Sequence, residues 1–179
     1  MKKVEHGKTF DRNAANPPAF EIFHNTVTEG YPEHWHTAIE IIMPTRGEYE
    51  VVVGKDSYNL KEGDIIMINS GVVHGMRFVS QGERIVMLVE PGCVENQEEM
   101  ETIFLRLPAI YFKKEDEEDP FYLFLRSQIL ELVREYDNEG AVMTHRICTG
   151  LKELFSEFGR KGVHTAVQAV PTRRIRSGQ

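Results

Sequence analysis

The sequence predicts a mainly β protein, in which a small antiparallel β-barrel is followed by a hairpin of two α-helices. Between residues 20 and 90, short runs rich in β-branched and aromatic residues alternate with turn signals at close, regular intervals, which is typical of an all-β barrel. Between residues 121 and 159, apolar residues recur at helical spacing instead. A chain of 179 residues is long enough for one such domain with a full core and a small appendage.

The expected strands follow one another closely along the chain. In order, they lie at residues 20–25, 34–43, 48–53, 57–60, 65–68, 74–79 and 84–89. Turn signals containing glycine separate most of them, and the turn at residues 54–56 joins two strands as a hairpin. The short strands and frequent turns therefore favour antiparallel pairing of neighbours.

Three histidines and one glutamate are placed so that strand geometry can bring them to one point. Alternate residues of a strand share a face, so His34, His36 and Glu40 are expected on the same side of one strand. Glu40 is followed by an apolar run, and a buried carboxylate there needs a partner. His74 opens a strand directly after the turn at residues 69–71. Three imidazoles and a carboxylate suit a divalent transition metal such as zinc, iron, manganese, nickel or copper, with positions open for water or a ligand.

Two motifs with these residues carry a family resemblance: His34-x-His36-x3-Glu40-x6-Gly47, then Gly63-x5-Asn69-x-Gly71-x2-His74. Their order and spacing resemble the two motifs of the cupin superfamily. Asn69 and Phe78 stand where that family usually has proline and asparagine. The resemblance implies a double-stranded β-helix, or jelly-roll, barrel over residues 20–112, with the four residues above as its metal ligands.

The helical hairpin is expected over residues 113–160. Its first helix spans residues 121–136, and its second stops at Gly159, after a turn at residues 137–140. The acidic run at residues 115–119 is interpreted as a solvated lead-in to the first helix. One apolar stripe would cover the barrel, and further apolar residues are expected to meet a second copy of the chain in a homodimer: Leu123, Phe124, Leu130 and Leu154.

The remaining segments are less informative. Residues 1–19 are interpreted as an N-terminal arm and residues 161–179 as a basic linker or tail. The net charge of −7 argues against nucleic-acid binding by this domain. Without an apolar run of membrane length or a secretory signal, a soluble cytoplasmic protein is expected, and Cys93 and Cys148 are expected to be reduced, partly buried thiols.

A cupin barrel followed by two amphipathic helices and a basic linker resembles the N-terminal effector-binding and dimerisation domain of AraC-type transcription regulators. That resemblance implies a barrel pocket for a small polar effector, such as a sugar or an organic acid, and helices that pair two chains. DNA would be contacted only through a C-terminal domain absent from this chain. Tyr49 joins the four metal-ligand candidates as a ligand-binding residue, whereas alternation places Trp35 on the opposite face and makes it the lesser candidate.

Two other functions remain open. The complete ligand set also fits a metal-dependent cupin enzyme, an isomerase or dioxygenase, and a stand-alone cupin binding protein is the third alternative. The helical hairpin, the basic linker and the lack of an additional acid or base forced into the pocket favour the regulator, and no residue is assigned a catalytic role.

Overall fold

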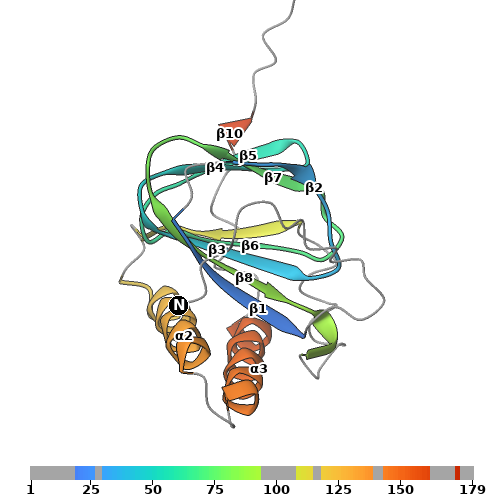
Figure 1. Ribbon diagram of the computed structural model, residues 1–179, viewed down its shortest axis with the longest axis vertical. Coiled ribbons are helices and arrows are strands. Elements are labelled where there is room, and N and C mark those ends of the chain that lie inside the picture. Colours follow the sequence, from blue (N-terminus) through green and yellow to red (C-terminus); the bar gives the residue numbers. More distant parts are fainter. Residues whose placement is uncertain are drawn as a thin grey trace, which may run out of the picture.

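Two facing β-sheets form the body of the protein, with two helices packed below one of them (Figure 1). The structure, a computed structural model, describes residues 19–26, 30–93, 108–114, 118–138, 143–161 and 172–173. The strands are β1 (Phe20–Asn25), β2 (Tyr31–His34), β3 (Ile39–Arg46), β4 (Tyr49–Val53), β5 (Asp56–Leu60), β6 (Ile65–Ile68), β7 (His74–Phe78), β8 (Glu83–Val89), β9 (Ala109–Phe112) and β10 (Thr172–Arg173). A short 3-10 helix η1 (Pro91–Cys93) and the helices α2 (Pro120–Asp137) and α3 (Met143–Lys161) follow in their places. The expected mainly β fold with a C-terminal helical hairpin is confirmed.

The first sheet, the helix-side sheet, has the order β1-β8-β3-β6-β9, and the second, the outer sheet, has the order β10-β5-β4-β7-β2. All paired strands are antiparallel. The barrel core between the sheets consists of Ile42, Tyr49, Val51, Val53, Tyr58, Leu60, Ile66, Ile68 and Met76. This core comes from alternate residues of each strand, as the period of two requires.

A second core lies between the helix-side sheet and the helices. On β3, Ile41 and Met43 belong to this core, whereas Ile42 between them belongs to the barrel core. Figure 1 shows α2 and α3 side by side beneath β1 and β8, which places the second core in that layer. The helices therefore pack against the outside of the barrel, and none of their described residues belongs to the barrel core.

The start of α2 is fixed by its sequence. The side chain of Asp119 accepts a hydrogen bond from the backbone N–H of Phe121 at 2.8 Å, and Pro120 occupies the first turn, where its missing N–H costs nothing. The hydroxyl of Tyr122 donates to the carbonyl of Gly63 at 2.8 Å, so the helix is tied to the barrel. A Cβ on Gly150 of α3 would come within 2.9 Å of Leu132, which shows how closely the two helices approach.

Four of the expected turns contain glycines with positive φ, at Gly47, Gly54, Gly63 and Gly71. Glycine adopts this conformation without steric penalty, and so the turn predictions at these points hold.

Several expectations need correction. The single strand through residues 34–43 is wrong, because β2 ends at His34 and β3 begins only at Ile39. The second helix continues past Gly159 to Lys161. Leu154 is fully buried in the second core and is therefore not available to a partner subunit.

Other expectations fall partly or wholly outside the described residues. These are residues 1–18 of the N-terminal arm, residues 115–117 of the acidic run and, apart from residues 172–173, the part of the basic linker at residues 162–179. Within that linker, Thr172–Arg173 form β10, which pairs with β5.

The two cysteines, far apart in the sequence, lie together in the fold. The sulfur of Cys93 in η1 is 3.5 Å from that of Cys148 in α3, and both thiols are free. Burial and the neighbouring Cys148 raise the pKa of Cys93 to about 11, so this thiol is a poor nucleophile at neutral pH.

No helix in the described part of the chain is long and apolar enough to cross a membrane.

Replacing Leu125 with alanine should lower the free energy of unfolding by about 2–5 kcal/mol, because its side chain is fully buried between sheet and helices. The matched control is Val79→Ala, just after β7 in the outer sheet, where the side chain is 55% exposed and the expected change is within about 0.5 kcal/mol. Urea denaturation at several protein concentrations would measure both. Equal effects of the two substitutions would contradict the assignment of the second core.

Candidate metal centre

The four metal-ligand candidates meet at one end of the barrel, between the two sheets. His34 ends β2 and lies directly opposite His74, the first residue of β7, so both come from the outer sheet. Glu40 lies on β3 in the helix-side sheet. His36 lies in the connection that crosses from β2 to β3. The site is therefore built from both sheets and the segment that joins them.

The crossing segment is held in place by backbone and side-chain hydrogen bonds. The N–H of Gly71 donates to the carbonyl of His36 at 2.8 Å. The hydroxyl of Thr37 donates to the carboxylate of Glu90 at 3.1 Å. The turn at residues 69–71, predicted from its glycine, thus supports the position of His36 as well as reversing the chain.

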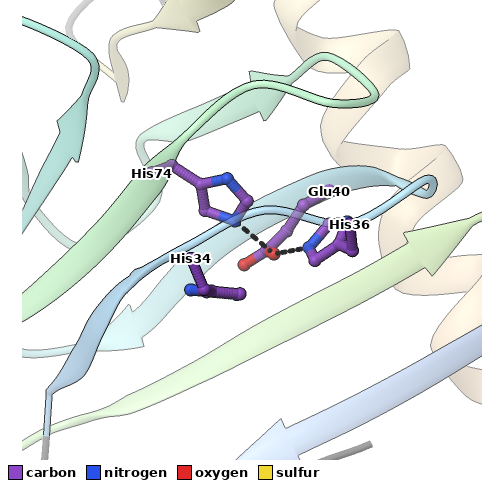
Figure 2. Close-up of side chains that lie close together, drawn as sticks. All are labelled: His34, His36, Glu40 and His74. Carbon is purple, nitrogen blue, oxygen red and sulfur yellow. Dashed lines mark hydrogen bonds and ion pairs between the residues drawn. The ribbon is translucent and has the colours of Figure 1, made fainter. Parts of the chain in front are cut away.

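The donor atoms of the four side chains, one from each, all lie within 4.8 Å of one another. The Nε2 atoms of His36 and His74 lie 2.9 Å and 3.0 Å from the same oxygen, Oε2 of Glu40. Figure 2 shows both rings pointing at this carboxylate, with His34 beside them. His36, Glu40 and His74 are buried, and His34 is half-buried, so the group opens toward solvent on the side of His34.

Each of the three imidazoles also makes a hydrogen bond through its Nδ1 atom to a backbone carbonyl two residues away. The pairs are His34 with Pro32 at 2.9 Å, His36 with Ala38 at 3.0 Å and His74 with Val72 at 2.8 Å. A carbonyl oxygen can only accept, so each Nδ1 carries the proton and donates it. The neutral form of every ring then has its lone pair on Nε2.

This arrangement fits a metal ion. A neutral Nε2 and a carboxylate oxygen both present lone pairs, so the short contacts at Glu40 require either an extra proton on each ring or a shared cation. Two donors bound to one ion by bonds of about 2.0–2.2 Å lie at most about 4.4 Å apart. The donor atoms here, which lie within 4.8 Å of one another, therefore need to approach by only a few tenths of an ångström to bind one ion. The three imidazoles and one carboxylate can hold a metal ion.

The electrostatics of the group favour a cation. Burial opposes ionisation of Glu40, but the hydrogen bonds from His36 and His74 outweigh it and lower the pKa of Glu40 to about 2. Burial also opposes protonation of His74, yet its hydrogen bond to Glu40 raises the pKa of this imidazole above its ordinary value. The pKa of His34 is lowered, chiefly by burial. Glu40 is thus an anion at any physiological pH.

The two aromatic candidates lie away from this group. Trp35 is 53% exposed, on the far side of the crossing segment from the buried rings, as alternation implies. Tyr49 is buried in the barrel core, but it pairs with Phe78 at the other end of β4 and β7, whereas His74 pairs with Val53. Its role in ligand binding stays a prediction.

An open groove of about 560 Å³ runs along the outer sheet without touching any of the four metal-ligand candidates. Its lining residues are Gly30, Tyr31, Pro32, Glu33, Val52, Gly75, Met76 and Arg77. Val52 alternates with Val51 and Val53 of the barrel core, so the groove lies mainly on the outside of the sheet. We therefore place the site chemistry at the convergent imidazoles and not in this groove.

Two features of the site could not be found by reading the sequence. The carbonyls that accept from the histidines belong to residues with no distinctive side chain, and only the backbone path places them. The break between β2 and β3 was also not visible, because residues 34–40 keep the alternation of a strand.

Comparison with known proteins places the barrel in a family. Residues 25–90 match the family model described as the cupin domain. These residues form a cupin domain. No curated protein sequence matches the chain significantly.

The cupin domain also has structural counterparts. ToxT from Vibrio cholerae, in its apo form, has a TM-score of 0.52 and 11% identity over 82% of this chain and 58% of ToxT. The SPY1581 protein of unknown function from Streptococcus pyogenes has a TM-score of 0.37 and 18% identity over 40% of this chain and 63% of that one. A cupin-2 domain protein from Shewanella frigidimarina has a TM-score of 0.36 and 16% identity over 41% and 72%, respectively. This chain spans less than two thirds of the first two proteins, and the likeness to ToxT shows a shared fold.

The protein purified without chelator should contain close to one equivalent of a transition metal, and His36→Ala should lose most of it because a buried ligand is removed. Elemental analysis measures the content directly. His145→Ala is the matched control, since His145 is exposed on α3 and should leave the metal content unchanged. A metal signal that is sub-stoichiometric and equal in all three proteins would contradict the site.

The affinity for Zn²⁺ should fall as the pH is lowered from 7.5 to 5.5, because protons compete for the imidazole nitrogens. The pKa of His74 is raised, so this ring takes up its proton at a higher pH than an ordinary histidine, whereas Glu40, with a pKa of about 2, stays ionised. Each ring that titrates in this window should weaken binding by about tenfold per pH unit. Titration against a competing chromophoric chelator at each pH measures the slope, and a flat profile would exclude imidazole ligation.

Proposed function

We propose that this chain is the small-molecule-sensing and dimerisation domain of an AraC-type transcription regulator. The observation that carries the proposal is the extent of the fold shared with ToxT, an AraC-type regulator whose N-terminal domain is cupin-like. A match over 82% of the 179 residues exceeds the barrel segment at residues 20–112, so it extends beyond the cupin domain into the helical part of the chain. A barrel with this helical addition is what the two proteins have in common.

The metal centre is proposed as the place where the small molecule binds. His34, His36, Glu40 and His74 would hold a divalent transition metal, such as zinc, iron, manganese or nickel. When bound, such an ion supplies a Lewis-acid position for oxygen atoms of a polar ligand. The half-buried His34 marks the side from which a ligand would approach, while burial of His36 and His74 excludes water from the other side. A small sugar or organic acid matches these donors.

Dimerisation is proposed through α2. Leu123 and Leu130 are 50% and 38% exposed, and their separation of seven residues places them two turns apart on one face of the helix. Phe124 beside them is only half-buried. Exposed apolar side chains that share a face favour contact with a partner, and a two-fold pair of identical chains is the commonest arrangement.

This arrangement gives the helices a role in signalling. The second core joins α2 and α3 to the same sheet that carries Glu40, so occupation of the site and the position of the dimer helices are mechanically connected. A ligand acts through such a connection only if it binds one helix arrangement more tightly than another. The net charge of −7 suits this role better than direct contact with DNA.

A metal-dependent cupin enzyme is the second candidate. One observation favours it, namely that the ligand set is complete and leaves coordination positions open. Turnover of a small polar substrate that depends on added metal, and that is lost in His36→Ala, would support the enzyme over the regulator.

Ligand binding and dimerisation should be coupled. The double variant Leu123→Glu, Leu130→Glu should be a folded monomer, because the charges would face each other across the dimer axis. Sugars and organic acids that raise the melting temperature of the wild type should bind the monomeric variant with an affinity changed by about 5–150-fold, the usual range of coupling between sites. Sedimentation measures the assembly, and calorimetry measures the affinity of each protein.

Val79→Glu is the control, since Val79 is exposed at the end of β7 and its charge lies away from α2. It should remain a dimer with unchanged ligand affinity. A wild type that is monomeric at high micromolar concentration would remove the dimerisation role. If monomer and dimer bound the ligand with equal affinity, the sensing role would be rejected and only a ligand-binding role would remain.

A further inference from the structure

The barrel interior contains a charged side chain that the metal centre does not use. Arg84 of β8 is completely buried, and in the described part of the chain no hydrogen-bond partner lies near its Nε, Nη1 or Nη2 atoms. An arginine stays ionised at any accessible pH, so it cannot avoid this situation by losing its proton. A buried charge without a partner is strongly destabilising, and it therefore calls for a counter-charge.

The register places Arg84 at the barrel end opposite the metal centre. On β8, Arg84 lies opposite Pro44, whereas Leu88 lies opposite Glu40. Four residues of strand correspond to about 13 Å, and the pair of Ile42 and Val86 lies between the two ends. The guanidinium is thus separated from the imidazoles by apolar side chains.

The ring of Tyr49 packs against Arg84 at this end of the barrel. The guanidinium carbon of Arg84 lies 4.9 Å from the centre of the Tyr49 ring, in a cation–π contact. Stacking occupies a face of the guanidinium and leaves the N–H groups in its plane free to bind an anion side-on. The hydroxyl of Tyr49 is also buried without a partner among the described residues. A Cβ on Gly82 would come within 2.8 Å of this hydroxyl, so glycine is required there for the packing.

The acid next to Arg84 in the sequence is already engaged. Glu83 pairs with Arg46 at 3.1 Å and lies 3.7 Å from His24. Within the described residues, Arg84 is the only lysine or arginine that is buried, so the interior at this end of the barrel holds a single positive charge. One monovalent anion would balance it, whereas a phosphate dianion would leave an excess buried negative charge.

We propose that Arg84 and Tyr49 form a second binding site, for the carboxylate of a small molecule, at the barrel end opposite the metal centre. The guanidinium supplies a two-pronged contact to the carboxylate, and the Tyr49 hydroxyl supplies a further donor. The site goes beyond the proposed sensing role and does not depend on the metal centre.

The test measures the melting temperature of protein refolded from urea in a low-chloride buffer, which removes an anion carried through purification. Sodium formate, sodium acetate and inorganic phosphate are titrated at constant ionic strength. The wild type should melt at a higher temperature as formate or acetate increases, since a ligand that binds only the folded state stabilises it. No increase with either carboxylate, or an increase with phosphate alone, would overturn the proposal.

Three variants identify the residues. Arg84→Met should fold, because replacing a buried charge with an apolar side chain of similar size is often neutral or stabilising, and should lose the carboxylate effect. Tyr49→Phe should need a severalfold higher concentration for the same effect. Arg77→Met, which changes an exposed arginine on β7, should respond as the wild type does. An Arg84→Met protein that still responds fully would overturn the proposal.

Two further measurements keep the outcome decisive. The response to acetate should survive in His36→Ala, which separates this site from carboxylate binding at the metal centre. The ¹⁵N resonance of the Arg84 Nε–H group should shift on addition of acetate, in the wild type itself, so the result does not rest on the folding of a variant. An unchanged resonance at concentrations that raise the melting temperature would place the anion elsewhere.

Discussion

The candidate metal centre depends on three hydrogen bonds, one from the Nδ1 of each histidine to a backbone carbonyl close to it in the sequence. Because every accepting carbonyl is two residues from its imidazole, the local backbone sets the tautomer. Three rings are thereby held with Nε2 toward the centre before a ligand or metal arrives. Glu40 adds a negative charge beside the three converging nitrogen atoms, so that the group attracts a cation. Burial strengthens this attraction. Removing one carbonyl contact would free a ring to rotate or change tautomer, and the set would lose its common focus.

The fold was predictable from sequence to the extent that it follows from local rules. Glycines such as Gly63 and Gly71 mark turns because the chain there needs positive φ, and strands between such turns have few ways to pair. The spacing of the four metal-ligand candidates also carried enough information to bring them together. Alternation placed His36 on the correct side but did not show that it lies between two strands. Its place in the crossing segment is set by a tertiary contact with Gly71 that leaves no trace in the local pattern.

Long-range packing accounts for the other differences. Leu154 looked available to a partner because a helical stripe shows its own width but not what lies opposite it, and Leu154 is in fact buried in the second core. The proximity of Cys93 and Cys148 arises from the docking of α3 and has no counterpart in their sequence spacing. Arg84 did carry a local signal, since alternation places it on the same face as Val86 and Leu88. An arginine on an otherwise apolar face breaks the local pattern, and such breaks are expected at functional or strained sites.

β3 faces two cores, and this has a mechanical consequence. Its inner face carries Glu40 and Ile42, and its outer face carries Ile41 and Met43 against the helices. The two faces of a strand share one backbone, so a rotation of the strand about its axis moves the side chains of both faces together. A rotation of β3 about its own axis would therefore move the Glu40 carboxylate together with the side chains that pack against the helices. The backbone of a single strand is all that separates the Glu40 carboxylate from the core beneath the helices.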